Sequence, residues 1–319
     1  MEKDLSRIKV VVIGGSVMDL VFPIRELPNW KQAVQAHAFR LYPGGKGLNQ
    51  SIAAARLGAT VSIISAVGDD DFGGQIIDYF ELHRVSHQYV QVVKSSFTDV
   101  TSVFVNEHGE PAFVGWKGIS SSQITPEQLQ RASPLIRDAD ILLITFEVSL
   151  DVVEEAISIA NNEKTFIVVD PAPPLDLLDP PPYSLLINID SLVPNFWEAG
   201  QLLRRESTAV ELAMQLHTLG AKIVCVTNAD KGCVVATKGK VTEHPSLFLG
   251  KPVDITGDTD AFCTAFAISI VSGKEMDDAV KIASAASALA VTKRGGAPSM
   301  PTLQEVNRFL TQVGLNIAL

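Results

Sequence analysis

Residues 253–266, VDITGDTDAFCTAF, place a glycine and three polar residues directly before an apolar run. If a helix begins between Asp258 and Asp260, its first backbone N–H groups can stabilise negative charge on a transferring phosphoryl group. Asp260 would then accept the proton of an attacking hydroxyl, as a general base in phosphoryl transfer. Asp and Thr are also among the best N-cap residues, so helix capping alone explains GDTD fully.

A second stretch, PGGKGLNQSIAAARLG at residues 43–58, opens a helix rich in small residues with three glycines and a lysine. Glycines let the backbone approach a ligand closely, and a helix N-terminus offers free N–H groups. Lys46 adds a charge, and Asn49, one turn later, can face the same ligand. A tight connection into a capped helix is the alternative, and the spacing of a P-loop is missing.

Two further stretches contain polar residues next to apolar runs. In VPNFWEAGQLL, Asn195 is a good N-cap and Glu198 follows three residues later, where it complements the helix dipole. The same pair can face a nucleotide and hold a hydrated Mg²⁺, which prefers carboxylate and water oxygens. VTNADKG, at residues 226–232, ends a strand in a turn, which is a usual place for ligand contacts and equally a plain turn.

Short β-branched runs alternate with helix-like segments along most of the chain, and this pattern predicts a doubly wound, mainly parallel sheet flanked by helices. The expected strands are KVVVIGG (9–15), TVSIISAVG (60–68), DILLITFE (140–147) and AKIVCVTNADKG (221–232). The expected helices are KGLNQSIAAARLG (46–58), FGGQIIDYFELH (72–83), DVVEEAISIANN (151–162) and STAVELAMQLHTLG (207–220).

Residues at about 16–43 and 97–118 read as strands without intervening helices, and NEHGEP makes a plausible hairpin turn between two of them. We expect them to pair into a small β lid on a single domain spanning residues 1–319. Such a lid excludes water from a site. An appendage used only for dimerisation is an alternative that does not exclude the first.

Composition limits the possible partners. The chain has 319 residues, 46% of them hydrophobic, and 36 acidic against 26 basic residues give a net charge of −10. This balance argues against nucleic acid or an anionic membrane as the main partner. The apolar run near the N-terminus is too short for a signal peptide, and no apolar stretch is long enough to span a bilayer. We therefore expect a cytoplasmic protein.

Taken together and in this order, VVIGGSVMDL, PGGKGLNQ, VPNFWEA, DITGDTDAF and ALAVTKRGGAPSMP resemble the motifs of the ribokinase-like (PfkB-type) carbohydrate kinases. The runs GGKGLNQ, FEVSLDVV and DPAP are most similar to the ribokinase branch. The resemblance implies the α/β fold with a β lid, a homodimer formed through that lid, ATP and Mg²⁺ as cofactors, and K⁺ as an activating cation.

The resemblance also implies roles for individual residues at matching positions. Asp260 is similar to the catalytic base, and the backbone of Gly257, Asp258 and Thr259 to the anion hole beside it. The substrate positions are Asp19, Gly44, Gly45, Lys46, Asn49 and Glu147. Asn195, Glu198, Thr227 and Gly232 match positions at ATP, with Glu198 holding Mg²⁺ through water. Asp254 and Thr256, with backbone near residues 288–299, resemble a site for a monovalent cation such as K⁺.

Three departures from the family pattern accompany these matches. Where the family has the run G-A-G-D, this chain has G-D-T-D at residues 257–260. Asp258 and Thr259 therefore replace the two small residues of the anion hole. A carboxylate about 4 Å from a phosphoryl charge costs roughly 4 kcal/mol at an effective dielectric of 20, or about a thousandfold in rate. Val17 replaces an asparagine that contacts the sugar, and Ala229 replaces a glycine of the nucleotide loop.

The leading hypothesis is therefore an ATP-dependent kinase of a small sugar or sugar-like substrate, acting on a primary hydroxyl. Two alternatives stay open. One is a catalytically impaired family member that binds a sugar or nucleotide in a regulatory role. The other is a kinase of the same family that acts on a nucleoside or a fructose-type sugar.

Overall fold

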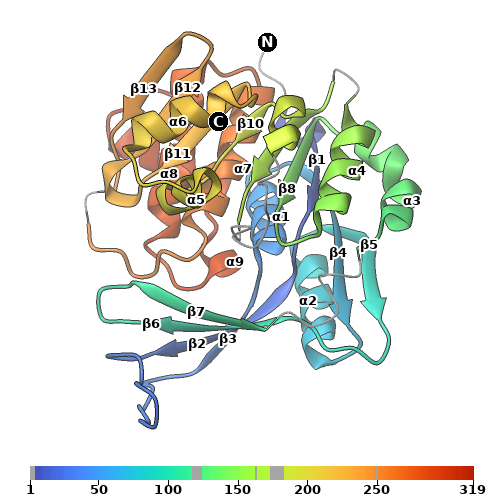
Figure 1. Cartoon of the computed structure of the whole chain (residues 1–319), viewed down its shortest axis with the longest axis vertical. Coiled ribbons are helices and arrows are strands. Elements are labelled where there is room, and N and C mark those ends of the chain that lie inside the picture. The colour runs from blue at the N-terminus through green and yellow to red at the C-terminus, as the bar shows by residue number, and fades with distance from the viewer. Residues whose placement is uncertain (1–3, 117–123, 162–163, 173–182, 249) are drawn as a thin grey trace.

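The computed structural model describes residues 4–116, 124–161, 164–172, 183–248 and 250–319 (Figure 1). Its large sheet has nine strands in the order β13-β12-β11-β10-β9-β8-β1-β4-β5. They are β1 (Lys9–Ile13), β4 (Thr60–Gly68), β5 (Ser86–Val93), β8 (Ile141–Thr145), β9 (Phe166–Asp170), β10 (Ser191–Leu192), β11 (Ile223–Thr227), β12 (Cys233–Thr237) and β13 (Lys240–His244). Neighbouring strands from β11 to β5 are parallel, whereas β12 pairs antiparallel with both β11 and β13. The predicted mainly parallel sheet is confirmed.

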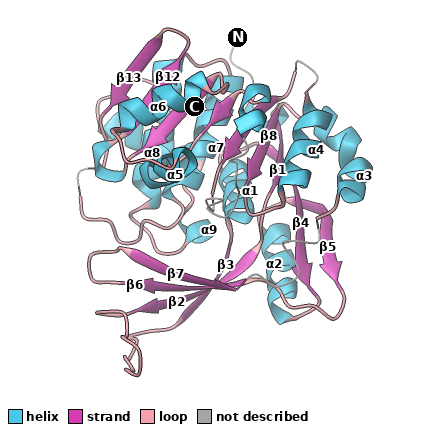
Figure 2. Cartoon of the chain, viewed as in Figure 1, coloured by secondary structure: helices cyan, strands magenta, loops and turns pink. Residues whose placement is uncertain are grey.

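Helices cover both faces of this sheet, as Figure 2 shows. Val10 and Val12 of β1 point into one apolar core, whereas Val11 and Ile13 point into the other. Strands buried on both faces read as continuous apolar runs, which explains the sequence pattern. The first core contains α1 (Lys46–Arg56), α2 (Asp71–Leu82), α7 (Asp258–Val271), α8 (Met276–Ala290) and α10 (Leu303–Gln312). The second contains α3 (Pro126–Arg137), α4 (Leu150–Ala160), α5 (Phe196–Leu203) and α6 (Ala209–Thr218).

Helix α7 is enclosed on all sides, since every residue from Thr259 to Ser269 is buried. Such a helix shows no polar face, in agreement with its mostly apolar sequence, in which Thr264 and Ser269 are buried as well. It packs against α1 and α8 and reaches the strands β8 and β9. Its N-terminus is therefore held in the centre of the molecule, next to the start of α1.

A second sheet of four strands, in the order β3-β2-β6-β7, lies below the large sheet in Figure 1. It consists of β2 (Val17–Pro23), β3 (Arg40–Gly44), β6 (Val100–Val105) and β7 (Pro111–Trp116). We call it the small sheet. Its strands fall within the two predicted ranges, with residues 117–118 outside the described part of the chain. Residues 106–110 make the predicted hairpin turn, closed by Gly109 N–H donating to the Asn106 carbonyl.

The strand order places the ligand crevice. In the sheet, β1 has β4 on one side and β8, which comes later in the chain, on the other. The strand order therefore reverses at β1, and ligands bind in the crevice that such a reversal leaves at the carboxyl ends of the strands. The small sheet begins four residues after β1 ends, so it lies at the same carboxyl edge. Within the described residues, no helix combines the length and apolar character needed to cross a membrane.

Candidate active site

Asp260 lies in the first turn of α7 and is 2% exposed. The Asn49 side-chain amide donates to its Oδ2 at 2.9 Å, and Gln50 Nε2 donates to its Oδ1 at 3.1 Å. Lys46 Nζ lies 3.7 Å from the same Oδ1. Three side chains from the first turns of α1 thus converge on one carboxylate at the start of α7. The structure brings together the predicted residues Lys46, Asn49 and Asp260.

Lys46 also forms an ion pair that the sequence did not reveal. Its Nζ lies 3.0 Å from Oδ2 of Asp170, the last residue of β9, whose side chain is fully buried. Gln50 Nε2 bridges the two carboxylates, since it also donates to Asp170 Oδ2 at 2.9 Å. Burial disfavours the ammonium, but the charges of Asp170, Asp260 and Glu198 outweigh it and raise the pKa of Lys46. Lys46 is therefore a fixed cation beside Asp260.

Glu147, just after β8, accepts hydrogen bonds from three backbone N–H groups. These belong to Gly15 at 2.8 Å, Lys46 at 2.9 Å and Gly47 at 3.0 Å, and the Thr145 hydroxyl donates as well at 2.9 Å. The carboxylate therefore ties the end of β1 to the start of α1. Both carboxylate oxygens of Glu147 already accept hydrogen bonds from backbone N–H groups. The predicted contact of Glu147 with sugar hydroxyls therefore stays a prediction.

Asp19 of β2 faces the same crevice from the small sheet and is 6% exposed. A side chain at Gly44 would place its Cβ 2.1 Å from Asp19 Oδ2, so the glycine is needed for the close approach. Gly45, the N-cap of α1, has φ of 89°, a conformation that favours glycine. Burial, together with the charges of Glu147, Asp254 and Asp260, raises the pKa of Asp19 to about 8.

This pKa predicts a specific dependence of stability on pH. In the unfolded chain Asp19 has a pKa near the ordinary value of 3.8, so between about pH 4 and pH 8 only the folded state keeps the proton. Wild-type stability should therefore fall over that window relative to Asp19→Asn, by up to about 5 kcal/mol. Urea unfolding of both proteins from pH 5 to pH 9 measures the difference. A constant difference across the range contradicts the assignment.

The predicted anion hole is occupied by the protein itself. Gly257 caps α7 with φ of 84° and makes no side-chain contact. The half-buried Asp258 turns its Oδ1 back onto the chain, where it accepts from Thr259 N–H at 2.6 Å and from the Thr259 hydroxyl at 3.2 Å. Burial raises the pKa of Asp258 to about 6, so its carboxylate is ionised at neutral pH. The Asp258 carboxylate thus caps the helix and competes with a phosphate for the same N–H.

Asn195 and Glu198 form a reciprocal capping box at the start of α5. Asn195 N–H donates to Glu198 Oε2, and Glu198 N–H to Asn195 Oδ1, both at 2.8 Å. Thr227, the last residue of β11, bridges to Asn195, so the two predicted ATP positions are adjacent. Glu198 is 5% exposed and its charge contributes to the raised pKa of Lys46. The capping interpretation is confirmed. The charge of the Glu198 carboxylate also acts on Lys46 and so contributes to the electrostatics of the site.

The loop after β11 keeps its turn although alanine replaces the usual glycine. Asn228 N–H donates to the Gly232 carbonyl at 2.7 Å, and Gly232 has φ of 93°. Ala229 has φ of 43°, in the left-handed region where a side chain costs about 1–2 kcal/mol. Ala229 therefore strains the backbone of the loop, but the hydrogen-bonded turn is kept.

Ala229→Gly is accordingly expected to stabilise the protein by about 0.5–1 kcal/mol, because relief of the strain exceeds the extra backbone entropy of glycine. Chemical denaturation measures the change as a higher midpoint. Ala55→Gly, in the α1 helix, is the control and should lower stability by about 1 kcal/mol. A lower midpoint for Ala229→Gly contradicts the strain at this position.

Asp254 and Thr256 lie in the segment before α7. Asp254 is 2% exposed and accepts from Thr256 N–H and from Gly295 N–H, each at 2.9 Å. The hydroxyl of Thr256 is buried and has no hydrogen-bond partner. The predicted backbone near residues 288–299 thus contacts Asp254 through Gly295.

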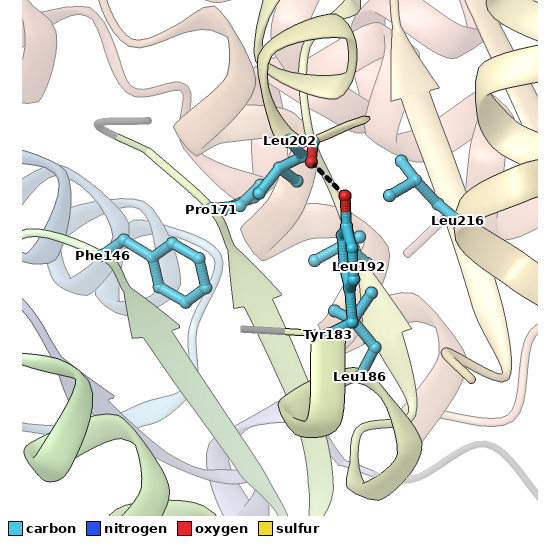
Figure 3. Close-up of a pocket in the computed structure, with 7 residues that line it drawn as sticks. All are labelled: Phe146, Pro171, Tyr183, Leu186, Leu192, Leu202 and Leu216. Atoms are coloured by element: carbon cyan, nitrogen blue, oxygen red, sulfur yellow. Dashed lines mark hydrogen bonds between the residues drawn. The ribbon is translucent and has the colours of Figure 1, made fainter. Parts of the chain in front are cut away.

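An apolar cavity, drawn in Figure 3, is lined mostly by residues of the core that α3–α6 cover, whereas α7 belongs to the other core. Its lining consists of Phe146, Pro171, Tyr183, Leu186, Leu192, Leu202 and Leu216. The only polar contact drawn there is the Tyr183 hydroxyl donating to the Leu202 carbonyl at 2.8 Å. Five of these residues belong to the core that α3–α6 cover, so the cavity is separate from the polar site around Asp260.

Comparisons with known proteins agree with this architecture. Residues 7–303 match the family described as pfkB family carbohydrate kinase. The chain is 32% identical over 302 residues to ribokinase of Bacillus subtilis, covering 95% of this chain and 99% of that protein. It is 29% identical over 306 residues to deoxyribokinase of Salmonella typhi, covering 95% and 98%.

Among solved structures, ribokinase of Arabidopsis thaliana complexed with ribose and ATP superposes with a TM-score of 0.84. The two are 26% identical, and the match covers 95% of this chain and 99% of the other. The family match extends over nearly the whole chain and includes every site residue described above. The chain therefore belongs to the pfkB family of carbohydrate kinases.

Proposed function

We propose that the protein transfers the γ-phosphoryl group of ATP to a primary hydroxyl of a small sugar or sugar-like substrate, with Asp260 as general base. The observation that carries this proposal is the convergence of Lys46, Asn49 and Gln50 on Asp260 at the N-terminus of a central helix. The base is thus held in place next to the N–H groups that face developing phosphoryl charge.

The substrate site lies between the start of α1 and the small sheet. Asn49 Oδ1 is buried and has no donor, whereas its amide nitrogen is used by Asp260. A buried acceptor without a partner is costly, and a substrate hydroxyl supplies the missing donor. Asp19 offers a second hydroxyl-binding group from the opposite side. Relatives of this chain include a ribokinase and a deoxyribokinase, which supports a pentose-sized substrate.

The substrate hydroxyl attacks the γ-phosphorus while its proton passes to the Asp260 carboxylate. The P–O bond to ADP breaks as the new P–O bond forms, and ADP leaves with the bridging oxygen. The Lys46 ammonium and those N–H groups of residues 257–260 that Asp258 leaves free stabilise the charge that accumulates on the transferred group. The small sheet excludes water from the reacting atoms.

Asn195, Glu198, Thr227 and Gly232 would hold the nucleotide. The carboxylate of Glu198 suits Mg²⁺ bound through water, because a hard cation prefers oxygen donors. When bound, the ion neutralises charge on the ATP phosphates. Asp254 and Thr256 would hold K⁺, and the buried Thr256 hydroxyl without a partner is the oxygen that this cation would engage.

The small sheet also supports the proposed homodimer. Its outer face carries Leu41, Val114 and Trp116, which are 39%, 64% and 51% exposed. On the same face Phe22 and Phe104 stack at 5.7 Å. Exposed apolar side chains gathered on one face are typical of protein contacts.

ADP formation from ATP, measured with Mg²⁺ and K⁺ across pentoses, hexoses and nucleosides, tests the proposed function. Substrate-dependent ADP release supports it, and the preferred substrate separates a pentose kinase from a nucleoside or fructose-type kinase. ADP release that no added substrate increases contradicts it.

A second candidate is a family member that binds its sugar or nucleotide in a regulatory role. The observation in its favour is the Asp258 carboxylate on the Thr259 N–H, where the phosphoryl group is expected. Variants of these two residues separate the candidates, as described in the Discussion.

A further inference from the structure

Arg40 lies on the substrate face of the small sheet. It begins β3 and pairs directly with Val21 of the antiparallel strand β2. Directly opposed residues point to the same face, and so do residues two positions apart. The next pair on this face is Asp19 with Tyr42. Because Asp19 faces Asp260 and Glu147, Arg40 faces the same crevice.

The charge of Arg40 has no counterion in the described structure. Its Nη1 is shielded from water and makes no hydrogen bond. The side chains beside it are apolar, with Val21 4% exposed and Val103 1% exposed. Arg40 as a whole is half-buried, but a shielded N–H group is rarely left unpaired, since it loses water without gaining a partner. Lys46, by contrast, is already paired with Asp170.

We propose that Arg40 binds an anionic substituent, a carboxylate or a phosphate, at the end of the substrate opposite the reacting hydroxyl. The substrate class is then a sugar acid or a sugar phosphate rather than a neutral sugar. This inference rests on the proposed function for the reaction, but the binding it describes does not require turnover.

The spacing fits a substrate of this kind. Asp19 of β2 and Arg40 of β3 are diagonal neighbours on one face, about 7–8 Å apart, which is roughly the length of a five- or six-carbon chain. A substrate whose hydroxyls contact Asp19 therefore extends to Arg40. Tyr42 lies opposite Asp19 and two positions from Arg40 on β3, and its ring is close to Gly295, so it closes this side of the crevice. The planar guanidinium presents paired N–H groups to a carboxylate or phosphate.

Binding calorimetry without nucleotide tests the inference, using ribose against ribonate and fructose against fructose 6-phosphate. The wild-type protein should bind the anionic member of one pair ten- to a hundredfold more tightly than the neutral one. Arg40→Met keeps the aliphatic stem and should remove this preference while leaving affinity for the neutral sugar unchanged. The exposed Arg25, also close to the small sheet, provides the control variant Arg25→Met, which should behave as wild type.

The two pairs distinguish the sources of the anion, because a preference for ribonate indicates a carboxylate and one for fructose 6-phosphate a phosphate. Melting temperature is the second measurement: Arg40→Met should melt at or above the wild-type temperature. Equal binding of neutral and anionic members, or a preference unchanged in Arg40→Met, overturns the inference even when ADP is formed. A markedly lower melting temperature also overturns it, since Arg40 would then serve folding. Anion preference without ADP formation supports the inference and contradicts the proposed function.

Discussion

Asp260→Asn is expected to lower kcat by about 10²- to 10⁴-fold, with affinities for ATP and substrate changed little. The amide has the size of the carboxylate and still contacts Asn49 or Gln50, but it cannot accept the proton of the substrate hydroxyl. Steady-state kinetics and calorimetric binding, measured on the same preparations, separate the two effects.

Asp170→Asn is the matched control, because Asp170 contacts the same lysine and the same glutamine from the opposite side. It weakens the positioning of Lys46 and leaves the base in place, so we expect a fall in kcat of at most about tenfold. Similar losses in the two variants would contradict the role of Asp260 as base and indicate that the charge network acts as a unit.

Asp258→Ala/Thr259→Gly is expected to increase kcat by about ten- to a thousandfold. The exchange frees the Thr259 N–H for the phosphoryl group and removes a charge that repels it. The same exchange removes a first-turn acidic residue from α7, which should lower stability by about 0.5–1 kcal/mol. Turnover rates and unfolding midpoints, measured on the same preparations, show whether the double variant gains activity as it loses stability.

Asp258→Asn separates the contribution of charge from that of the occupied N–H. The amide oxygen still accepts from Thr259, so this variant should recover only the electrostatic part of the gain. An unchanged kcat in both variants contradicts the inhibitory contact. A gain in the double variant from an inactive wild type favours the regulatory candidate, with an intact pocket and a blocked anion hole.

The sequence predicted the fold because each signal was local and repeated. Buried parallel strands give continuous apolar runs, and helices between them give the doubly wound order. Asp260, Lys46 and Asn49 were predicted because each lies at a glycine-containing turn into a helix and because the runs around them, in this order, resemble the motifs of one family. The start of α7 at Asp258 falls within the predicted interval.

Contacts between distant segments could not be predicted in the same way. Asp170 and Gln50 are 120 positions apart, and only the fold places their side chains 2.9 Å from each other. A signal existed for each, since Asp170 is the only charged residue of the run FIVVD and Gln50 follows Asn49 directly. The turn of the Asp258 side chain onto Thr259 depends on a local competition between capping and ligand binding, which residue types do not decide.

Transfer of labelled γ-phosphoryl from ATP to the substrate is the measurement that tests the central claim most directly. It should be made with wild type, Asp260→Asn and Asp258→Ala/Thr259→Gly, on the substrate that binds most tightly. We predict label in the substrate for wild type, more for the double variant, and almost none for Asp260→Asn. A substrate that binds with ATP and stays unlabelled with both wild type and the double variant contradicts the kinase.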